Sequence, residues 1–114
     1  SLPPAVQGNA MRVIEDNGNH AVISYRDGLF TPFVVTVTAA TGCFVDIQNQ
    51  SDEILTPRLG PYDPAKESGY LYPLIASHAH ALIDPRYGAG RQFSFYAKEL
   101  PAAVFTVSID PGCL

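Results

Sequence analysis

Apolar and polar residues alternate along most of this chain, which is the repeat of a β-strand whose successive side chains point to opposite faces. This alternation predicts strands at 11–15, 20–26, 33–38, 43–49, 53–56, 79–83, 92–97 and 103–109. Turn-forming residues separate these segments, and Asp27-Gly28 is the strongest signal for a tight hairpin turn. Many short strands at this spacing predict an all-β fold, an antiparallel Greek-key β-sandwich.

The alternation also assigns the faces of the predicted strands. Val45 and Ile47 share one face with Cys43, whereas Asp46 and Gln48 share the other, so Cys43 is expected on the core side. The same rule turns two further sets of side chains toward the core: Phe93, Phe95 and Ala97, and Phe105, Val107 and Ile109.

The pattern loosens between about residues 57 and 77, where four prolines interrupt it. Proline has no N–H to donate to a sheet, so this stretch is predicted to be a long ordered loop, with one helical turn at 64–69. Four tyrosines lie in this loop or in the next turn: Tyr62, Tyr70, Tyr72 and Tyr87. Because a tyrosine ring gives contact area at a small entropic cost, they predict a surface for a protein partner or for self-association. The alternative is that these rings cover the open end of the sandwich.

Composition narrows the classes of function. The 114 residues suit one domain, 1–114, and with 46% apolar and 16% charged residues the chain can bury a core. A net charge of −4 with seven Lys and Arg argues against nucleic-acid binding, which needs a clustered basic surface. No apolar run is long enough to span a membrane.

The two cysteines, Cys43 and Cys113, lie far apart in the sequence and lack the close spacing of a zinc site. We expect either one disulfide that ties a central strand to the C-terminal end or two buried free thiols. A disulfide goes with an extracytoplasmic location, periplasmic or secreted, which is the location we expect.

Three segments of the chain form a recognisable set: Gly28-Leu29-Phe30-Thr31-Pro32-Phe33-Val34-Val35-Thr36-Val37, then 41–52 with its Val45, Ile47 and Asn49, and finally 90–96 with 101–109. Together they resemble strands of the cupredoxin family, to which plastocyanin and azurin belong. The resemblance implies a cupredoxin-like sandwich and, in the family, copper held by two His, one Cys and usually a Met. Here 52–58 contains no His, Ile109 stands where the Cys would, and only Leu114 follows Cys113. We therefore expect the fold without a standard blue-copper site.

Ser77-His78-Ala79-His80 carries the most distinctive chemistry of the sequence. Residues i and i+2 of a strand share a face, so both imidazoles could reach one Cu or Zn ion. A third ligand would come from elsewhere in the chain: His20, Asp63, Asp84 or the N-terminal amine. The alternative is a pair of surface histidines that form only local hydrogen bonds.

Together these patterns predict a non-enzymatic, extracytoplasmic binding or assembly module with no certain cofactor. The alternative is a protein that binds or handles Cu or Zn through His78 and His80. A hydrolase built from Ser77, His78 and Asp84 has the least support, because adjacency in sequence does not create the geometry of a triad.

Overall fold

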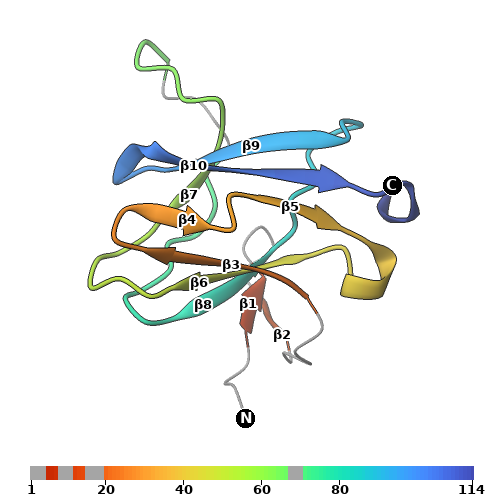
Figure 1. Ribbon diagram of the computed structural model, residues 1–114, viewed down its shortest axis with the longest axis horizontal. Coiled ribbons are helices and arrows are strands. Elements are labelled where there is room, and N and C mark those ends of the chain that lie inside the picture. The colour runs from red at the N-terminus through yellow and green to blue at the C-terminus, as the bar shows by residue number, and fades with distance from the viewer. Residues whose placement is uncertain (1–4, 8–11, 15–19, 67–70) are drawn as a thin grey trace.

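The computed structural model describes residues 5–7, 12–14, 20–66 and 71–114, and these residues form two β-sheets packed face to face (Figure 1). In this part of the chain one sheet has six strands in the order β2-β1-β8-β6-β3-β4 and the other has four in the order β5-β10-β9-β7. The strands are β1 (Ala5–Gln7), β2 (Arg12–Ile14), β3 (Ala21–Arg26), β4 (Leu29–Thr31), β5 (Val34–Val37), β6 (Val45–Asn49), β7 (Pro57–Leu59), β8 (His80–Ile83), β9 (Gln92–Ala97) and β10 (Leu100–Ile109). Short 3-10 turns, η1 (Ala39–Thr41) and η2 (Pro111–Cys113), follow β5 and β10. No helix in the described ranges is long and apolar enough to cross a membrane.

The predicted β-sandwich is confirmed, but its sheets are mixed and not purely antiparallel. Among the described residues, three strand pairs run parallel: β3 with β6, β5 with β10, and β1 with β8. The chain order explains the first of these pairs. After β4 the chain crosses to the other sheet as β5 and returns through η1, so β6 enters beside β3 in the same direction.

The hairpin turn predicted at Asp27-Gly28 connects β3 and β4. Arg26 pairs with Leu29, and both central residues of this two-residue turn have positive φ, 52° at Asp27 and 74° at Gly28. Positive φ at both positions is the requirement of the turn type that matches strand twist, which is why an Asp-Gly sequence occupies it. Local sequence therefore determines this turn.

The core lies between the two sheets and contains the side chains that the alternation turned inward. Val45, Ile47 and Val107 are fully buried, and Phe95 stacks on Phe105 with ring centroids 4.9 Å apart. The burial of Asp46 does not follow from the alternation. The alternation puts Asp46 on the outer face of β6, yet the residue is buried there, opposite the buried Leu82 of β8.

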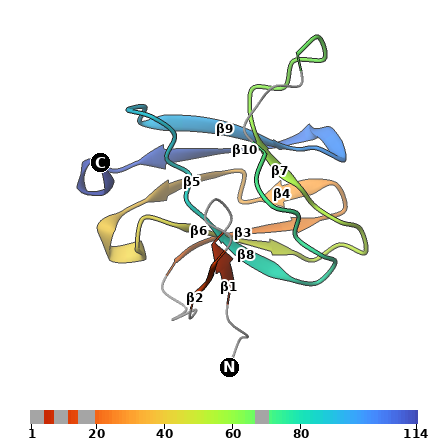
Figure 2. The same ribbon diagram turned by 180° about the vertical axis from the view of Figure 1, so that it is seen from behind.

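The predicted 57–77 loop contains regular structure at both of its ends. Pro57 begins β7, which pairs on one side with β9, and proline is tolerated as the first residue of such a strand. Isolated bridges join Arg58 to Leu71 and Leu55 to Ile75. Instead of the strand predicted at 53–56, the structure has only the bridge at Leu55. Between these anchors the segment after β7 projects away from the four-stranded sheet in both views (Figures 1 and 2). The helical turn predicted at 64–69 begins as a turn with Lys66 N donating to Asp63 O, and 67–70 lie outside the described residues.

The structure joins Cys43 and Cys113 by a disulfide, the first of the two expected arrangements, with Cα atoms 5.6 Å apart. The bond ties the segment before β6 to η2 at the C-terminal end. Arg86 reinforces this end of the sandwich. Its Nη1 donates to the Cys113 carbonyl oxygen at 2.9 Å, while its Nε and Nη2 donate to both carboxylate oxygens of Asp84.

Candidate functional site

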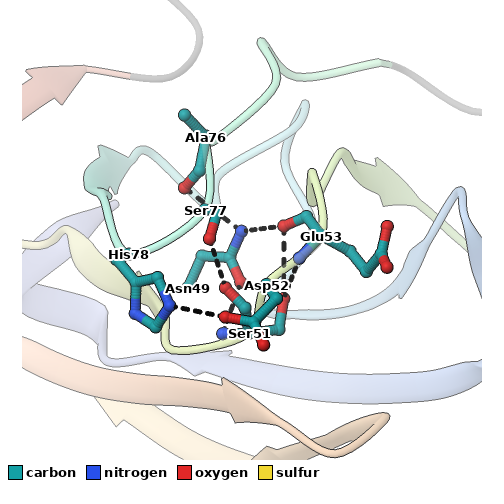
Figure 3. A network of polar contacts seen from close by, with 7 residues as sticks. All are labelled: Asn49, Ser51, Asp52, Glu53, Ala76, Ser77 and His78. Atoms are coloured by element: carbon teal, nitrogen blue, oxygen red, sulfur yellow. Dashed lines mark hydrogen bonds and ion pairs between the residues drawn. The ribbon is translucent and has the colours of Figure 1, made fainter.

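Asn49, the last residue of β6, organises the loops at the other end of the sandwich (Figure 3). Its side chain is 1% exposed, and Nδ2 donates to the carbonyl oxygens of Glu53 at 2.7 Å and Ile75 at 3.0 Å. Its Oδ1 accepts hydrogen bonds from the backbone N–H of Ser51 at 3.1 Å and from the Ser51 hydroxyl at 2.6 Å. One buried amide therefore holds the loop after β6 against the segment that leads into β8.

His78 belongs to a turn and not to a strand, because β8 begins only at His80. His78 has a φ of 60°, and its Nε2 lies 2.9 Å from Oδ1 of the exposed Asp52 (Figure 3). The alternation of side chains that placed His78 and His80 on one strand face does not apply across this turn. In the neighbouring residue, Ser77 Oγ donates to the Ser51 carbonyl oxygen at 2.7 Å.

His80 lies on β8 beside the buried Asp46 of β6. The two residues are 11% and 4% exposed at their side chains, and Nδ1 of His80 is 2.9 Å from Oδ1 of Asp46. His20 has a third kind of partner, since its Nδ1 lies 3.1 Å from the Thr41 carbonyl oxygen. The three histidines thus contact different groups. Within the described ranges, no three His, Cys, Asp or Glu side chains are arranged so that they could hold a metal ion.

Two carboxylates considered as metal ligands or catalytic residues have other roles in this structure. Asp84 forms a bidentate ion pair with Arg86, and the hydrogen bonds that Arg86 donates to Asp84 raise the pKa of the guanidinium. Asp63 accepts a hydrogen bond from the backbone N–H of Ala65. Ser77, His78 and Asp84 each contact a different group, so their hydrogen bonds do not connect them as a triad.

The structure does not gather the four predicted tyrosines on one surface. The surface position predicted for Tyr72 is wrong, because this residue is 2% exposed and its ring contacts Phe95 in the core. Its hydroxyl donates a hydrogen bond to the Asp84 carbonyl oxygen at 3.2 Å. Its backbone N–H donates to the Pro57 carbonyl oxygen, which draws this segment against β7 and turns the ring inward. Tyr72 thus closes the sandwich, as the alternative expected.

The remaining tyrosines differ from one another in position. Tyr62 is 40% exposed and packs edge-on against Tyr96 of β9, with ring centroids 5.2 Å apart. Tyr87 is exposed in the turn between β8 and β9. Tyr70 lies outside the described residues.

Glu99 is a residue that the sequence patterns did not single out, because it stands in the turn between two strong strands. Its Oε1 accepts the backbone N–H of Thr56 at 2.8 Å, and its Oε2 accepts the Thr56 hydroxyl at 2.6 Å. Burial, together with the negative charge of Glu99, raises the pKa of Tyr25 above its ordinary value of 10.0. A carboxylate two residues before Pro101, in a hairpin turn, was the only available signal.

Comparison with known proteins identifies the fold of this chain but does not show what the chain binds or does. The sequence matches no known protein family, and no curated protein is similar enough in sequence to count as a relative. Solved structures are similar in fold. A reduced amicyanin variant has 13% identity and a TM-score of 0.60, covering 96% of this chain and 94% of that one.

Two further solved structures agree with the first. Amicyanin from Paracoccus versutus has 10% identity and a TM-score of 0.60, over 96% of this chain and 93% of its own. A purple cupredoxin from Nitrosopumilus maritimus has 14% identity and a TM-score of 0.56, over 79% of this chain and 99% of its own. The chain therefore has a cupredoxin-like fold, which confirms the resemblance found in its strands.

Proposed function

We propose that this chain, a cupredoxin-like β-sandwich, is a non-enzymatic, extracytoplasmic binding or assembly module that engages a protein partner or a second copy of itself through the projecting loop at 60–66. One observation carries the proposal. The half-exposed ring of Tyr62 is held on this loop by Tyr96, at a centroid distance of 5.2 Å. An aromatic ring that is already fixed in place loses little entropy when a partner covers it.

The base of the loop supports the same proposal. Gly60 donates its N–H to the Ser94 carbonyl oxygen at 2.7 Å, so the loop leaves β7 from a point that is fixed against β9. A Cβ at Gly60 would approach that oxygen to 3.3 Å and the Tyr96 ring to 3.3 Å, closer than most such contacts. Gly60 therefore lets the loop lie close enough to β9 for the two tyrosine rings to meet.

The non-enzymatic part of the proposal rests on what the polar side chains at the loop end of the sandwich do. Asn49, Ser77 and Glu99 all hydrogen-bond backbone groups of other loops. Groups used in this way position the loops. The extracytoplasmic part rests on the disulfide, which persists in oxidising compartments.

Sedimentation velocity over a range of protein concentrations tests the loop as an association surface. We expect concentration-dependent association that Tyr62→Ala weakens about tenfold, the effect of removing an interface anchor worth roughly 1.4 kcal/mol. Tyr87→Ala is the matched control, because it removes another exposed tyrosine, from a different turn. For a different protein as partner, a photoreactive residue at position 62 should give a cross-linked product in source cells that position 87 does not. Equal behaviour of the two positions in both experiments would contradict the proposal.

Copper or zinc handling through His78 and His80 is the second candidate. It is favoured by the carboxylates of Asp52 and Asp46, each of which holds one imidazole nitrogen at 2.9 Å, as carboxylates that orient metal-binding histidines do. Calorimetric titration with Cu(II) and Zn(II) should then show binding that His78→Ala and His80→Ala each weaken. Binding no tighter than about 1 mM would contradict this candidate.

A further inference from the structure

A groove lies at the end of the sandwich opposite the disulfide, where several turns meet. The β3–β4 turn, the loop after β6, His78 and the β9–β10 turn line it. The β3–β4 and β9–β10 turns lie at the same end of the molecule in Figure 1. The groove is separate from the projecting loop, whose residues do not line it.

Tyr25 of β3, a largely buried residue, supplies a hydroxyl to this groove. The residue is 6% exposed and its ring packs on Phe30, with centroids 4.7 Å apart, yet it lines the groove. Its hydroxyl has no hydrogen-bond partner among the described residues. Because the ring is packed in the core while the hydroxyl is not among the fully buried atoms, this hydroxyl is available to a ligand in the groove.

The walls of the groove are acidic. Asp27, Asp52, Glu53 and Glu99 line it, against Arg26 and His78 as the basic residues. Nε of Arg26 and Oδ2 of Asp27 lie 3.8 Å apart, so the charges of these two side chains offset each other. Glu99 is fixed by its two hydrogen bonds from Thr56, which leave each carboxylate oxygen a second lone pair. The negative charge of Glu99 also acts on Tyr25, because it contributes to the raised pKa of the Tyr25 hydroxyl.

Apolar side chains complete the groove. Ile54 and Leu100 line it and are about half exposed. A ligand that matches this surface has an apolar stem for Ile54 and Leu100 and a cationic head that donates hydrogen bonds. Lysine and arginine side chains have this form, because their methylene stems pack on apolar surface while their heads stay polar.

We propose that this groove binds a lysine or arginine side chain presented by a partner protein. The cationic head donates hydrogen bonds to the Tyr25 hydroxyl oxygen and to the Glu99 carboxylate, and the stem lies against Ile54 and Leu100. The site is independent of Tyr62, so the binding proposed for the projecting loop can fail while this binding holds.

The test is an NMR titration of the ¹⁵N-labelled protein with capped peptides Gly-Ser-X-Ser-Gly, where X is Arg, Lys, norleucine or Glu. The Arg and Lys peptides should shift the amide signals of 26–28, 50–54 and 98–100 and reach saturation. The norleucine and Glu peptides should not. Spermidine distinguishes the source of the cation. Binding of spermidine tighter than that of both basic peptides would overturn the assignment to a protein side chain.

Three variants locate the effect within the groove. Tyr25→Phe removes only the hydroxyl and should weaken binding of the basic peptides at least fivefold, as should Glu99→Gln. Should Glu99→Gln fail to fold, Asp52→Asn takes its place, because it also removes one negative charge from the groove. The amide oxygen in the Asp52→Asn variant can still accept a hydrogen bond from His78, so the turn is kept. Amide spectra of the free variants report whether each is folded.

Asp110→Asn is the matched control, because it removes the same charge near the end of β10, far from Leu100 at the start of that strand. Its amide oxygen can still cap η2 by accepting from Gly112 N. We expect unchanged peptide binding. Equal weakening by Asp110→Asn, or unchanged binding in Tyr25→Phe and Glu99→Gln, would overturn the proposal in favour of general attraction to a negatively charged protein.

Discussion

At one end of the sandwich a disulfide and an ion pair hold the loops, whereas at the other end side chains hold them by hydrogen bonds to backbone groups. The first end contains Cys43, Cys113 and the Asp84–Arg86 pair. The second end contains Asn49 and Glu99. The comparison shows that the disulfide end is built to stay closed, while the hydrogen-bonded end keeps carboxylates and an available hydroxyl facing a groove.

Loss of the disulfide should have the largest effect on stability. Cys43→Ala with Cys113→Ala frees a loop with a sequence separation of 70, so we expect the free energy of unfolding to fall by about 4 kcal/mol in urea denaturation. Amide exchange should become faster at 84–86 and 110–114 and stay unchanged at 50–54. Faster exchange at both ends would show that the two ends are not independent.

Asn49→Ala should have the next largest effect, because it leaves buried carbonyl groups without the donor that serves them. We expect a loss of about 3 kcal/mol in the free energy of unfolding, and faster amide exchange at the groove end only. Gln48→Ala is the control, since Gln48 is the neighbouring residue of β6 and makes one side-chain contact of 3.3 Å, to Asp46. A loss no greater than that of the control would mean that Asn49 does not organise these loops.

A smaller effect is expected from the buried tyrosine that reaches toward the disulfide end. Tyr72→Phe removes the hydrogen bond to the Asp84 carbonyl oxygen and should cost about 1 kcal/mol of unfolding free energy. Tyr62→Phe, which removes an exposed hydroxyl, should leave stability unchanged. Equal stability of the two variants would place the Tyr72 hydroxyl outside the structural hydrogen bonds.

The smallest effect concerns pH and belongs to the groove. The folded state raises the pKa of Tyr25 above its ordinary 10.0, so the folded protein holds this proton more tightly than the unfolded chain. The resulting contribution to stability is complete below pH 10 and is lost as pH rises through the folded pKa. Unfolding measured between pH 9 and 11 should show a steeper fall for the wild type than for Tyr25→Phe. Equal slopes would contradict the burial of this hydroxyl beside Glu99.

Residues close in sequence determined those parts of the structure that the sequence predicted well. The Asp27-Gly28 turn and the inward faces of β9 and β10 follow from φ preferences and from alternation alone. The burial of Asp46 and Tyr72 could not be predicted in this way. Both depend on which distant strands come to lie beside them, which alternation does not encode.

The sequence by itself thus determined an all-β sandwich and its principal core faces, because strand repeat and turn chemistry are properties of the chain. Tertiary structure decided the parallel pairings, since these depend on where the chain crosses between sheets. It also decided that His78 and His80 turn to different carboxylates and that Tyr25 and Glu99 line one groove. The groove arises only where turns far apart in sequence meet at one end of the sandwich.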